Sequence, residues 1–262
     1  MQDLLHQVQI NIPFTMLYDS YLDRFLEYEL NPEIGIDAAA LERFEFSDFQ
    51  HIAEKLHNKA LSITLHGPFN DLSAGSTDPA VKAVTRNRFE QLLNLVPVFK
   101  PRAVVCHPGY DRKRYGYYRE EWIENSLETW SWLADGLNEL NSRLMLENVY
   151  EDGPKDMSII FERLKPQKVG FCLDPGHLSA FGQSGLDIWL KGLGSYIGQL
   201  HLHDNHGSND EHLAMGYGII DFKLIFKYLK ANNLPQPIVT LEPHQEEDLW
   251  PSLAYLATVW PW

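Results

Sequence analysis

Residues 143–177 read RLMLENVYEDGPKDMSIIFERLKPQKVGFCLDPGH, and this stretch decides the fold. It contains two short apolar runs, 143–148 and 168–174, of the kind that form buried β-strands. Between them, residues 155–164 place apolar side chains every three or four positions, as one face of an amphipathic helix does. Two apolar strands joined by a helix predict a parallel pair with a crossover connection.

The same alternation runs through the whole chain of 262 residues. Strand-like runs occupy residues 7–12, 33–38, 61–66, 102–107, 143–148, 168–174, 197–204 and 237–243. Helical patterns fall between them, at residues 46–59, 78–99, 119–140, 155–164, 185–193 and 221–233. Eight such units of about 33 residues predict an α/β protein with a closed (β/α)8 TIM barrel. An open sheet would also need a glycine-rich phosphate loop after its first strand, and INIPFTMLYDS (10–20) lacks one.

Composition agrees with one globular unit. Hydrophobic residues make up 44% of the chain and charged residues 22%, a balance that excludes disordered and collagen-like chains. No linker divides the sequence, so we expect a single domain over residues 1–262. No secretory signal or membrane span of ~20 apolar residues is visible. Cys106 and Cys172 lie in strand-like runs and are expected to be reduced and buried, which predicts a cytoplasmic protein.

The net charge is −14, from 22 lysines and arginines against 36 aspartates and glutamates. A surface that neutralises phosphates of nucleic acid should be locally basic, so this charge disfavours a nucleic-acid partner. The basic and aromatic stretch DRKRYGYYRE (111–120) is the exception. It follows the fourth strand and is either a substrate lid or phosphate contact, or a solvated loop. The charge favours a small-molecule partner.

Polar side chains gather at the carboxyl ends of the predicted strands, where the catalytic groups of a (β/α)8 barrel lie. These strand-end residues are His66, His107, Glu147, Asp174, His177, His201, His203 and Glu242, and a following loop adds Asp210 and His212. Taken singly, each has a structural explanation such as helix capping. Six of the 11 histidines are among these residues, however, and burying several carboxylates together is costly without cations. We therefore predict a divalent-metal site.

The ligand types narrow the choice of metal. Mixed imidazole and carboxylate ligands favour zinc, with manganese, iron or cobalt as alternatives, over calcium or magnesium. Neither cysteine is predicted to be a ligand. Strand alternation turns Cys106 away from the barrel axis, and Cys172 is expected to point inward below the ligands.

These motifs resemble those of the xylose-isomerase-like barrel superfamily. That superfamily includes sugar-phosphate isomerases and epimerases and the family 2 AP endonucleases. The resemblance spans residues 61–243 and rests on H-G-P-F, H-P-G, L-E-N, L-D-P-G-H, H-L-H-D-N, D-E-H-L-x-x-G-x-G and L-E-P.

The resemblance implies up to three metal positions, so one to three divalent ions per chain. The four-ligand site of the isomerases and epimerases corresponds to Glu147, Asp174, His201 and Glu242. A second site, as in the AP endonucleases, corresponds to His66 and His107 with Glu147 bridging. The third corresponds to His177, Asp210 and His212. The chain departs from the endonucleases at Phe69, where they carry a DNA-holding tyrosine, and the loop AAALERFEFSD (38–48) offers one arginine.

Two reactions remain open. In the first, one metal ion chelates a sugar or sugar phosphate and stabilises an enediolate, while Glu147 and Glu242 move a proton on either face. In the second, two or three zinc ions clamp a phosphoester for hydrolysis, which the full ligand set favours. Short loops place the isomerase or epimerase first. The predicted substrate contacts are His203, Asn148 and Phe69. A non-enzymatic scaffold is disfavoured because no ligand is missing.

Overall fold

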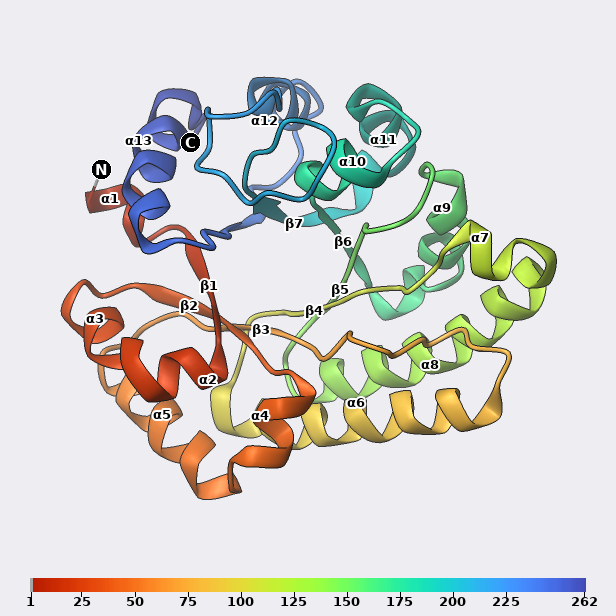
Figure 1. Cartoon of the computed structure of the whole chain (residues 1–262), viewed down its shortest axis with the longest axis horizontal. Helices are drawn as coiled ribbons and strands as arrows, with labels where there is room; N and C mark the ends of the chain where they lie inside the picture. The colour runs from red at the N-terminus through yellow and green to blue at the C-terminus, as the bar shows by residue number, and fades with distance from the viewer. Residues whose placement is uncertain (1) are drawn as a thin grey trace.

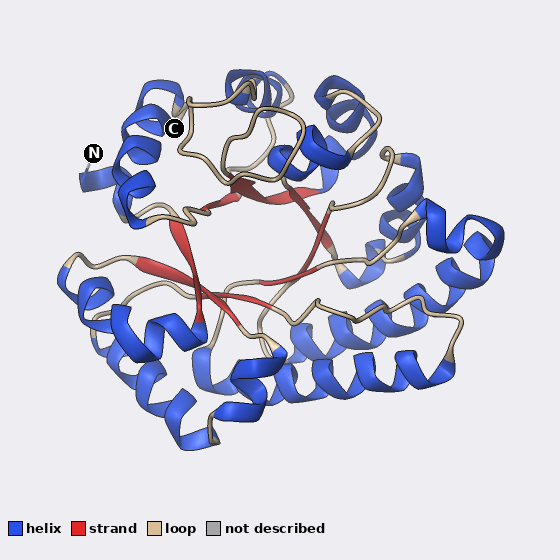
Figure 2. Cartoon of the chain, viewed as in Figure 1, coloured by secondary structure: helices blue, strands red, loops and turns tan. Residues whose placement is uncertain are grey.

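Eight parallel strands close into a barrel in the computed structural model, which describes residues 2–262. Each strand pairs with its neighbours in sequence, and β1 closes the ring against β8. The strands are β1 (Gln9–Pro13), β2 (Asn31–Gly35), β3 (Thr64–His66), β4 (Val104–Cys106), β5 (Leu144–Glu147), β6 (Gly170–Leu173), β7 (Ile197–Leu202) and β8 (Ile238–Leu241). Figure 2 shows these strands as an inner ring with the helices outside it. The predicted (β/α)8 fold is confirmed.

Helices connect successive strands and form the outer layer (Figure 1). The longer ones are α5 (Phe46–Asn58), α6 (Pro79–Phe99), α8 (Arg119–Glu139), α9 (Lys155–Arg163), α10 (Pro175–Phe181), α11 (Leu186–Leu193), α12 (Phe222–Ala231) and α13 (Leu249–Val259). The shorter ones are α1 (Gln2–Leu5), α2 (Phe14–Met16), α3 (Leu22–Glu27), α4 (Ala38–Arg43) and α7 (Arg112–Tyr115). Single turns of other helix types are η1 (Leu17–Tyr21), η2 (Gly116–Tyr118), η3 (Lys165–Gln167), η4 (Gly194–Tyr196) and η5 (Glu246–Asp248).

Strand alternation divides the core into two parts. On β5, Leu144 and Leu146 face the helices and join the large apolar cluster between the barrel and its outer layer. Met145 instead joins a small cluster inside the barrel with Val105 and Cys172. Each of these three inward residues precedes a predicted ligand by two positions. The ligands at the ends of β4, β5 and β6 therefore stand one layer above apolar side chains.

Aspartate side chains start several helices. The N-cap aspartates of α4, α6, α7, α10 and α12 each accept a hydrogen bond from a backbone N–H of the first turn. At α10 the cap is Asp174, whose Oδ1 accepts from the backbone N–H of His177 at 2.8 Å. One predicted ligand thereby fixes the backbone of another.

The first two units differ from the sequence-based expectation. Strand β2 covers Asn31–Gly35 rather than residues 33–38, because the Asn31 side chain hydrogen-bonds to the backbone of Val8 and of Ser62. The stretch 38–48, expected to be a loop, holds α4 over residues 38–43, whereas α5 begins at Phe46, where the predicted helical pattern starts. A helix as short as α4 gives little periodicity to detect in a sequence. The basic stretch 111–120 is likewise helical, with α7 and η2 leading into α8.

Helices of the described residues 2–262 are either too short or too polar to cross a lipid bilayer. The cytoplasmic location stays a prediction, as does the assignment of one domain to residues 1–262.

The core assignment predicts different costs for two leucines. Leu146 is fully buried on β5, whereas Leu140 at the end of α8 is 39% exposed. Leu146→Ala is expected to lower the free energy of unfolding by about 2–5 kcal/mol because it leaves a cavity. Leu140→Ala should cost less than about 1 kcal/mol. Urea denaturation followed by tryptophan fluorescence measures both, and equal losses would contradict the assignment.

Candidate metal centre

All nine predicted ligand residues come together at the carboxyl ends of β3 to β8 and in the loop after β7. Their ligand atoms lie in overlapping groups of three or four, within which all atoms are within 4.8 Å of one another, and these groups also include His203, Cys172 and Glu33. The nine residues are His66, His107, Glu147, Asp174, His177, His201, Asp210, His212 and Glu242. Residues from distant parts of the sequence thus share one site.

Glu147 lies at the centre of the cluster and is 1% exposed. Its Oε2 lies 3.2 Å from His66 Nε2 and 3.4 Å from His107 Nε2. Its Oε1 lies 3.1 Å from His201 Nδ1 and 3.2 Å from His177 Nδ1. Each carboxylate oxygen therefore faces its own pair of imidazoles, the arrangement of a carboxylate able to bridge two cations.

The surroundings keep these carboxylates ionised. Burial alone would raise the pKa of Glu147, but the imidazoles of His201 and His107 outweigh it and hold the pKa well below its usual value. Burial would also raise the pKa of Glu242, but the His201 imidazole outweighs it, so the pKa of Glu242 is lowered as well. For His201, burial would lower the pKa, but Cys172 and the surrounding carboxylates raise it well above its usual value. The centre of the cluster therefore favours positive charge.

Several buried lone pairs converge without hydrogen bonds. His201 Nδ1 lies 3.1 Å from an oxygen of Glu147 and 2.9 Å from an oxygen of Glu242, yet it forms no hydrogen bond. Asp210 Oδ1 is also buried without a hydrogen-bond partner. Orphaned buried polar atoms are costly, and a cation between them would satisfy several at once. The residues present therefore fit divalent metal ions, and their imidazole and carboxylate donors suit zinc.

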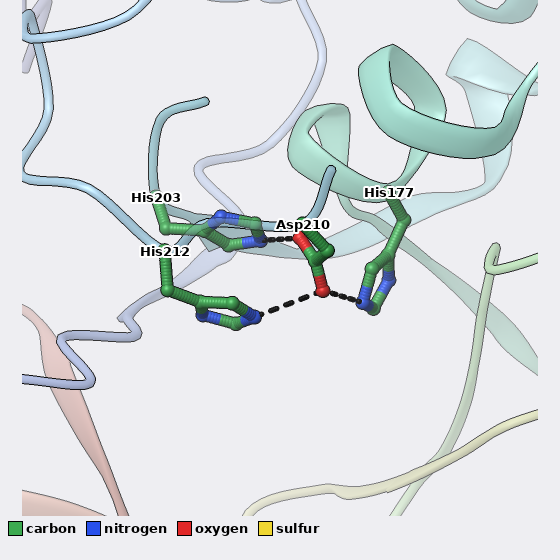
Figure 3. Close-up of side chains that lie close together, drawn as sticks. All are labelled: His177, His203, Asp210 and His212. Carbon is green, nitrogen blue, oxygen red and sulfur yellow. Dashed lines mark hydrogen bonds and ion pairs between the residues drawn. The ribbon is translucent and has the colours of Figure 1, made fainter. Parts of the chain in front are cut away.

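Asp210 is the hub of a second group, shown in Figure 3. Its Oδ2 lies 3.3 Å from His177 Nε2 and 3.1 Å from His212 Nε2. His212 holds its backbone in the left-handed region, at φ 52°. A residue other than glycine adopts this conformation at a cost, and such strain is often kept at functional sites.

His203 also belongs to this group, and its Nε2 lies 3.6 Å from Asp210 Oδ1 (Figure 3). Its ring stacks on that of His212 at 3.7 Å between centroids and 10° between planes. His244 also stacks on His212, at 3.6 Å. The same nitrogen of His203, Nε2, lies 3.2 Å from Asp174 Oδ2.

The motif around His203 also shapes the loop that carries Asp210 and His212. A side chain at Gly176 would meet the His203 ring, since a Cβ there would lie 2.0 Å from it. Asp204 accepts hydrogen bonds from the backbone N–H groups of Gly216 at 2.9 Å and Ile220 at 3.2 Å. The H-L-H-D-N segment therefore supplies a ligand, a packing surface and a loop anchor.

The three predicted substrate contacts occupy different places. Phe69 is 42% exposed, stacks on His107 at 4.3 Å and lines the cavity above the cluster. Asn148 is buried, donates to the Asp174 carbonyl at 2.8 Å and accepts from the Asp174 N–H at 2.9 Å. Asn148 and His203 are both buried and are not among the described residues that line the cavity, so their geometry fits positioning rather than contact with substrate.

Sequence reasoning did not single out Glu33, Glu151 or His244. Glu33 is fully buried, and its Oε1 lies 2.8 Å from His201 Nε2. Glu151 lines the cavity, and burial raises its pKa to about 7. In the sequence, Glu33 stands out only as an acidic residue in an apolar run. The pattern does not reveal it as a buried strand residue, because the pattern predicts that the strand begins at this residue. Cys172 lies near Glu147 and His201, but burial raises the pKa of its thiol, which disfavours ligation.

A cavity of about 650 Å³ opens above the cluster. Glu147, His177, Asp210 and Glu242 lie at its base, and Phe69, Tyr150 and Phe181 are among its aromatic walls. Arg114 is the single lysine or arginine among its described lining residues. This volume is that of a small-molecule site.

The barrel and its donor set define the class of protein, and comparison with known families gives the same result. The sequence profile of the xylose isomerase-like TIM barrel family matches residues 29–258. The chain belongs to this family.

Its relatives carry different names. The uncharacterized protein MJ1311 of Methanocaldococcus jannaschii is 26% identical over 190 residues, which cover 70% of this chain and 65% of that protein. The chain thus spans just under two thirds of that relative's length. A probable endonuclease 4 of Mycobacterium leprae is 24% identical over 210 residues, covering 75% of this chain and 80% of the relative.

Solved structures repeat the fold over nearly the whole chain. The TTHB071 protein of Thermus thermophilus, soaked with ZnCl2, has a TM-score of 0.83 and 26% identity, covering 97% of this chain and 98% of that one. A D-tagatose 3-epimerase-like protein has a TM-score of 0.79 and 21% identity, covering 97% and 96%. At this identity, the second similarity shows the fold alone.

The central position of Glu147 predicts its effect on metal content. Glu147→Gln is expected to remove at least half of the bound zinc, because both groups of imidazoles lose their shared carboxylate. The control is Glu54→Gln, at an exposed position of α5, which should bind as much zinc as the unchanged protein. Elemental analysis after chelation and reloading with zinc measures the zinc content of each variant. Full zinc content in folded Glu147→Gln would refute the central role.

Proposed function

We propose that the protein is a hydrolase that uses two or three divalent metal ions, zinc foremost, to cleave a phosphoester of a small molecule. The supporting observation is the two-sided environment of Glu147, with His66 and His107 on one oxygen and His201 and His177 on the other. This geometry reverses the order that the short loops favoured from sequence.

The hydrolase is favoured because an enediolate mechanism requires Glu147 to perform two functions. There, one carboxylate oxygen binds the metal and the other moves the proton. Here the second oxygen lies within 3.4 Å of both His66 and His107, so it is already engaged. A bridging carboxylate uses both oxygens, which is the arrangement that a two-metal phosphoesterase needs.

The chain's own residues divide the work. Glu147 would bridge two positions, one completed by His66 and His107 and the other by Asp174, His201 and Glu242. The residues suited to a third position are His177, Asp210 and His212. Metal ions bound there would polarise phosphoryl oxygens and acidify a water molecule. Phe69 and the cavity walls would enclose the substrate and limit the water that reaches it.

Size and charge of the cavity point to a small substrate. Its volume of about 650 Å³ suits a compact ligand. Among the described lining residues, Asp37, Asp71 and Asp111 accompany a single cation, Arg114. An extended DNA backbone needs a basic groove, which this lining and the net charge of −14 disfavour. A phosphorylated sugar fits both the metal chemistry and the space.

A second candidate is an isomerase or epimerase acting on a sugar or sugar phosphate. One observation favours it: His201 Nδ1 lies within 3.1 Å of both Glu147 and Glu242, which come from β5 and the end of β8. Two carboxylates flanking one metal position can transfer a proton on either face of a substrate. The epimerase-like structures share the fold with this chain.

Replacement of His107 separates the two candidates. His107→Gln is expected to reduce phosphate release from sugar phosphates and aryl phosphates by at least about 100-fold, because one metal position loses a ligand. His51→Gln, at an exposed position of α5, should retain full activity. Zinc-loaded proteins are compared by released phosphate and by ketose interconversion. Interconversion without phosphate release would select the isomerase, and it would survive His107→Gln.

A further inference from the structure

Glu33 is a buried carboxylate without a role so far. It lies at the centre of β2 and has no exposed surface. Its partner in the ladder on one side is Thr64 of β3, and on the other side Asn11 of β1. Among the described residues, His201 is the single basic group within 4.0 Å of it. An ionised group in such a place needs compensation from fixed partners.

Three strands hold one oxygen of this carboxylate. Glu33 Oε2 accepts hydrogen bonds from Thr64 Oγ1 at 2.9 Å, from Thr240 Oγ1 at 3.1 Å and from Gln199 Nε2. All four side chains are buried. Because the donors come from β3, β8 and β7, they fix both the position and the rotation of the carboxylate.

The other oxygen faces a predicted metal ligand. Glu33 Oε1 lies 2.8 Å from His201 Nε2, on the side of the ring away from Glu147 and Glu242. A proton on Nε2 would let Glu33 accept a hydrogen bond at this distance, whereas Nδ1 faces two carboxylates, as a metal ligand would. Gln199 Nε2 also lies 3.4 Å from His201 Nε2. A neutral imidazole that carries its proton on Nε2 has its lone pair on Nδ1. That lone pair faces the point where Glu147 and Glu242 converge.

We propose that Glu33 is a positioning residue of the metal centre, which accepts the Nε2 proton of His201 and so presents Nδ1 to a metal ion. The surrounding hydroxyl and amide groups of Thr64, Thr240 and Gln199 hold Glu33 in this orientation. The proposal rests on the metal centre but not on the reaction, so it stands apart from the choice between hydrolase and isomerase.

The neutral variant Glu33→Gln gives a sharp test. The donors around Oε2 should draw the amide oxygen to that position, which leaves the amide NH2 facing His201 Nε2. The NH2 would donate to Nε2 and shift the ring proton to Nδ1, where it blocks the metal. Zinc affinity is expected to fall by about 10- to 100-fold, as for other lost partners of ligating histidines.

Two readouts follow in the full-length protein. Competition with a chelator gives the zinc affinity, and ¹⁵N NMR of the histidine side chains shows which nitrogen of His201 carries the proton. The unchanged zinc-loaded protein should show a protonated Nε2 and a metal-bound Nδ1. Loss of that signature with weaker zinc binding in Glu33→Gln supports the proposal. Unchanged affinity and an unchanged His201 signature would overturn it.

A purely structural role for Glu33 makes a different prediction. In that case Glu33→Gln would lower the free energy of unfolding without changing which nitrogen of His201 carries the proton. The matched control is Glu151→Gln, which also removes a buried carboxylate but makes no contact with His201, and should keep the His201 signature.

If Glu33→Gln does not fold, Thr64→Val with Thr240→Val removes two hydroxyl groups that orient Glu33. This pair should also weaken zinc binding, and wild-type zinc affinity in it would overturn the proposal.

Discussion

Four imidazole rings lie within 3.4 Å of the buried carboxylate of Glu147, two on each oxygen. Such a group is costly to bury unless positive charge compensates it from both sides. The barrel provides the setting, because the carboxyl ends of parallel strands bring side chains from distant parts of the chain to one place. Apolar residues of β4 to β6 fill part of the layer beneath, and the polar network of Glu33 fills the part below His201. The Asp174 cap and the Asp204 loop anchor hold the flanking ligands. Much of the local structure serves to hold this one charged cluster.

Most of the fold could be predicted from sequence because each long amphipathic helix and each apolar strand carries its own periodicity. The nine candidate ligands could be predicted because they follow strand ends in recognisable motifs. The short helices after β1 and β2 escape such prediction, since one turn leaves almost no pattern. Glu33 escapes it because its role depends on where β2 begins, and a side chain of Asn31 settles that boundary through tertiary hydrogen bonds.

The surroundings of Asn148 and His203 add information that sequence patterns do not carry, and their contact with substrate stays a prediction. Both belong to motifs next to predicted ligands, which makes them candidates for substrate contact. Asn148 instead ties β5 to β6 through the backbone of Asp174, and His203 lies between Asp174 and the stacked ring of His212. A motif gives the neighbourhood of a residue, whereas the direction of its side chain depends on the surrounding packing. Phe69, at the cavity mouth, is the predicted contact that faces the space where a substrate would lie.

The family contains barrels of both chemistries considered, so the number of metal ions is the deciding property. The most direct measurement is anomalous diffraction at the zinc absorption edge from crystals of the zinc-loaded protein. A bridging Glu147 predicts two ions on opposite sides of its carboxylate, about 3.5–4 Å apart, one of them bound by His66 and His107. A single ion held by Glu147, Asp174, His201 and Glu242, with His66 and His107 bound to no metal, would contradict the account.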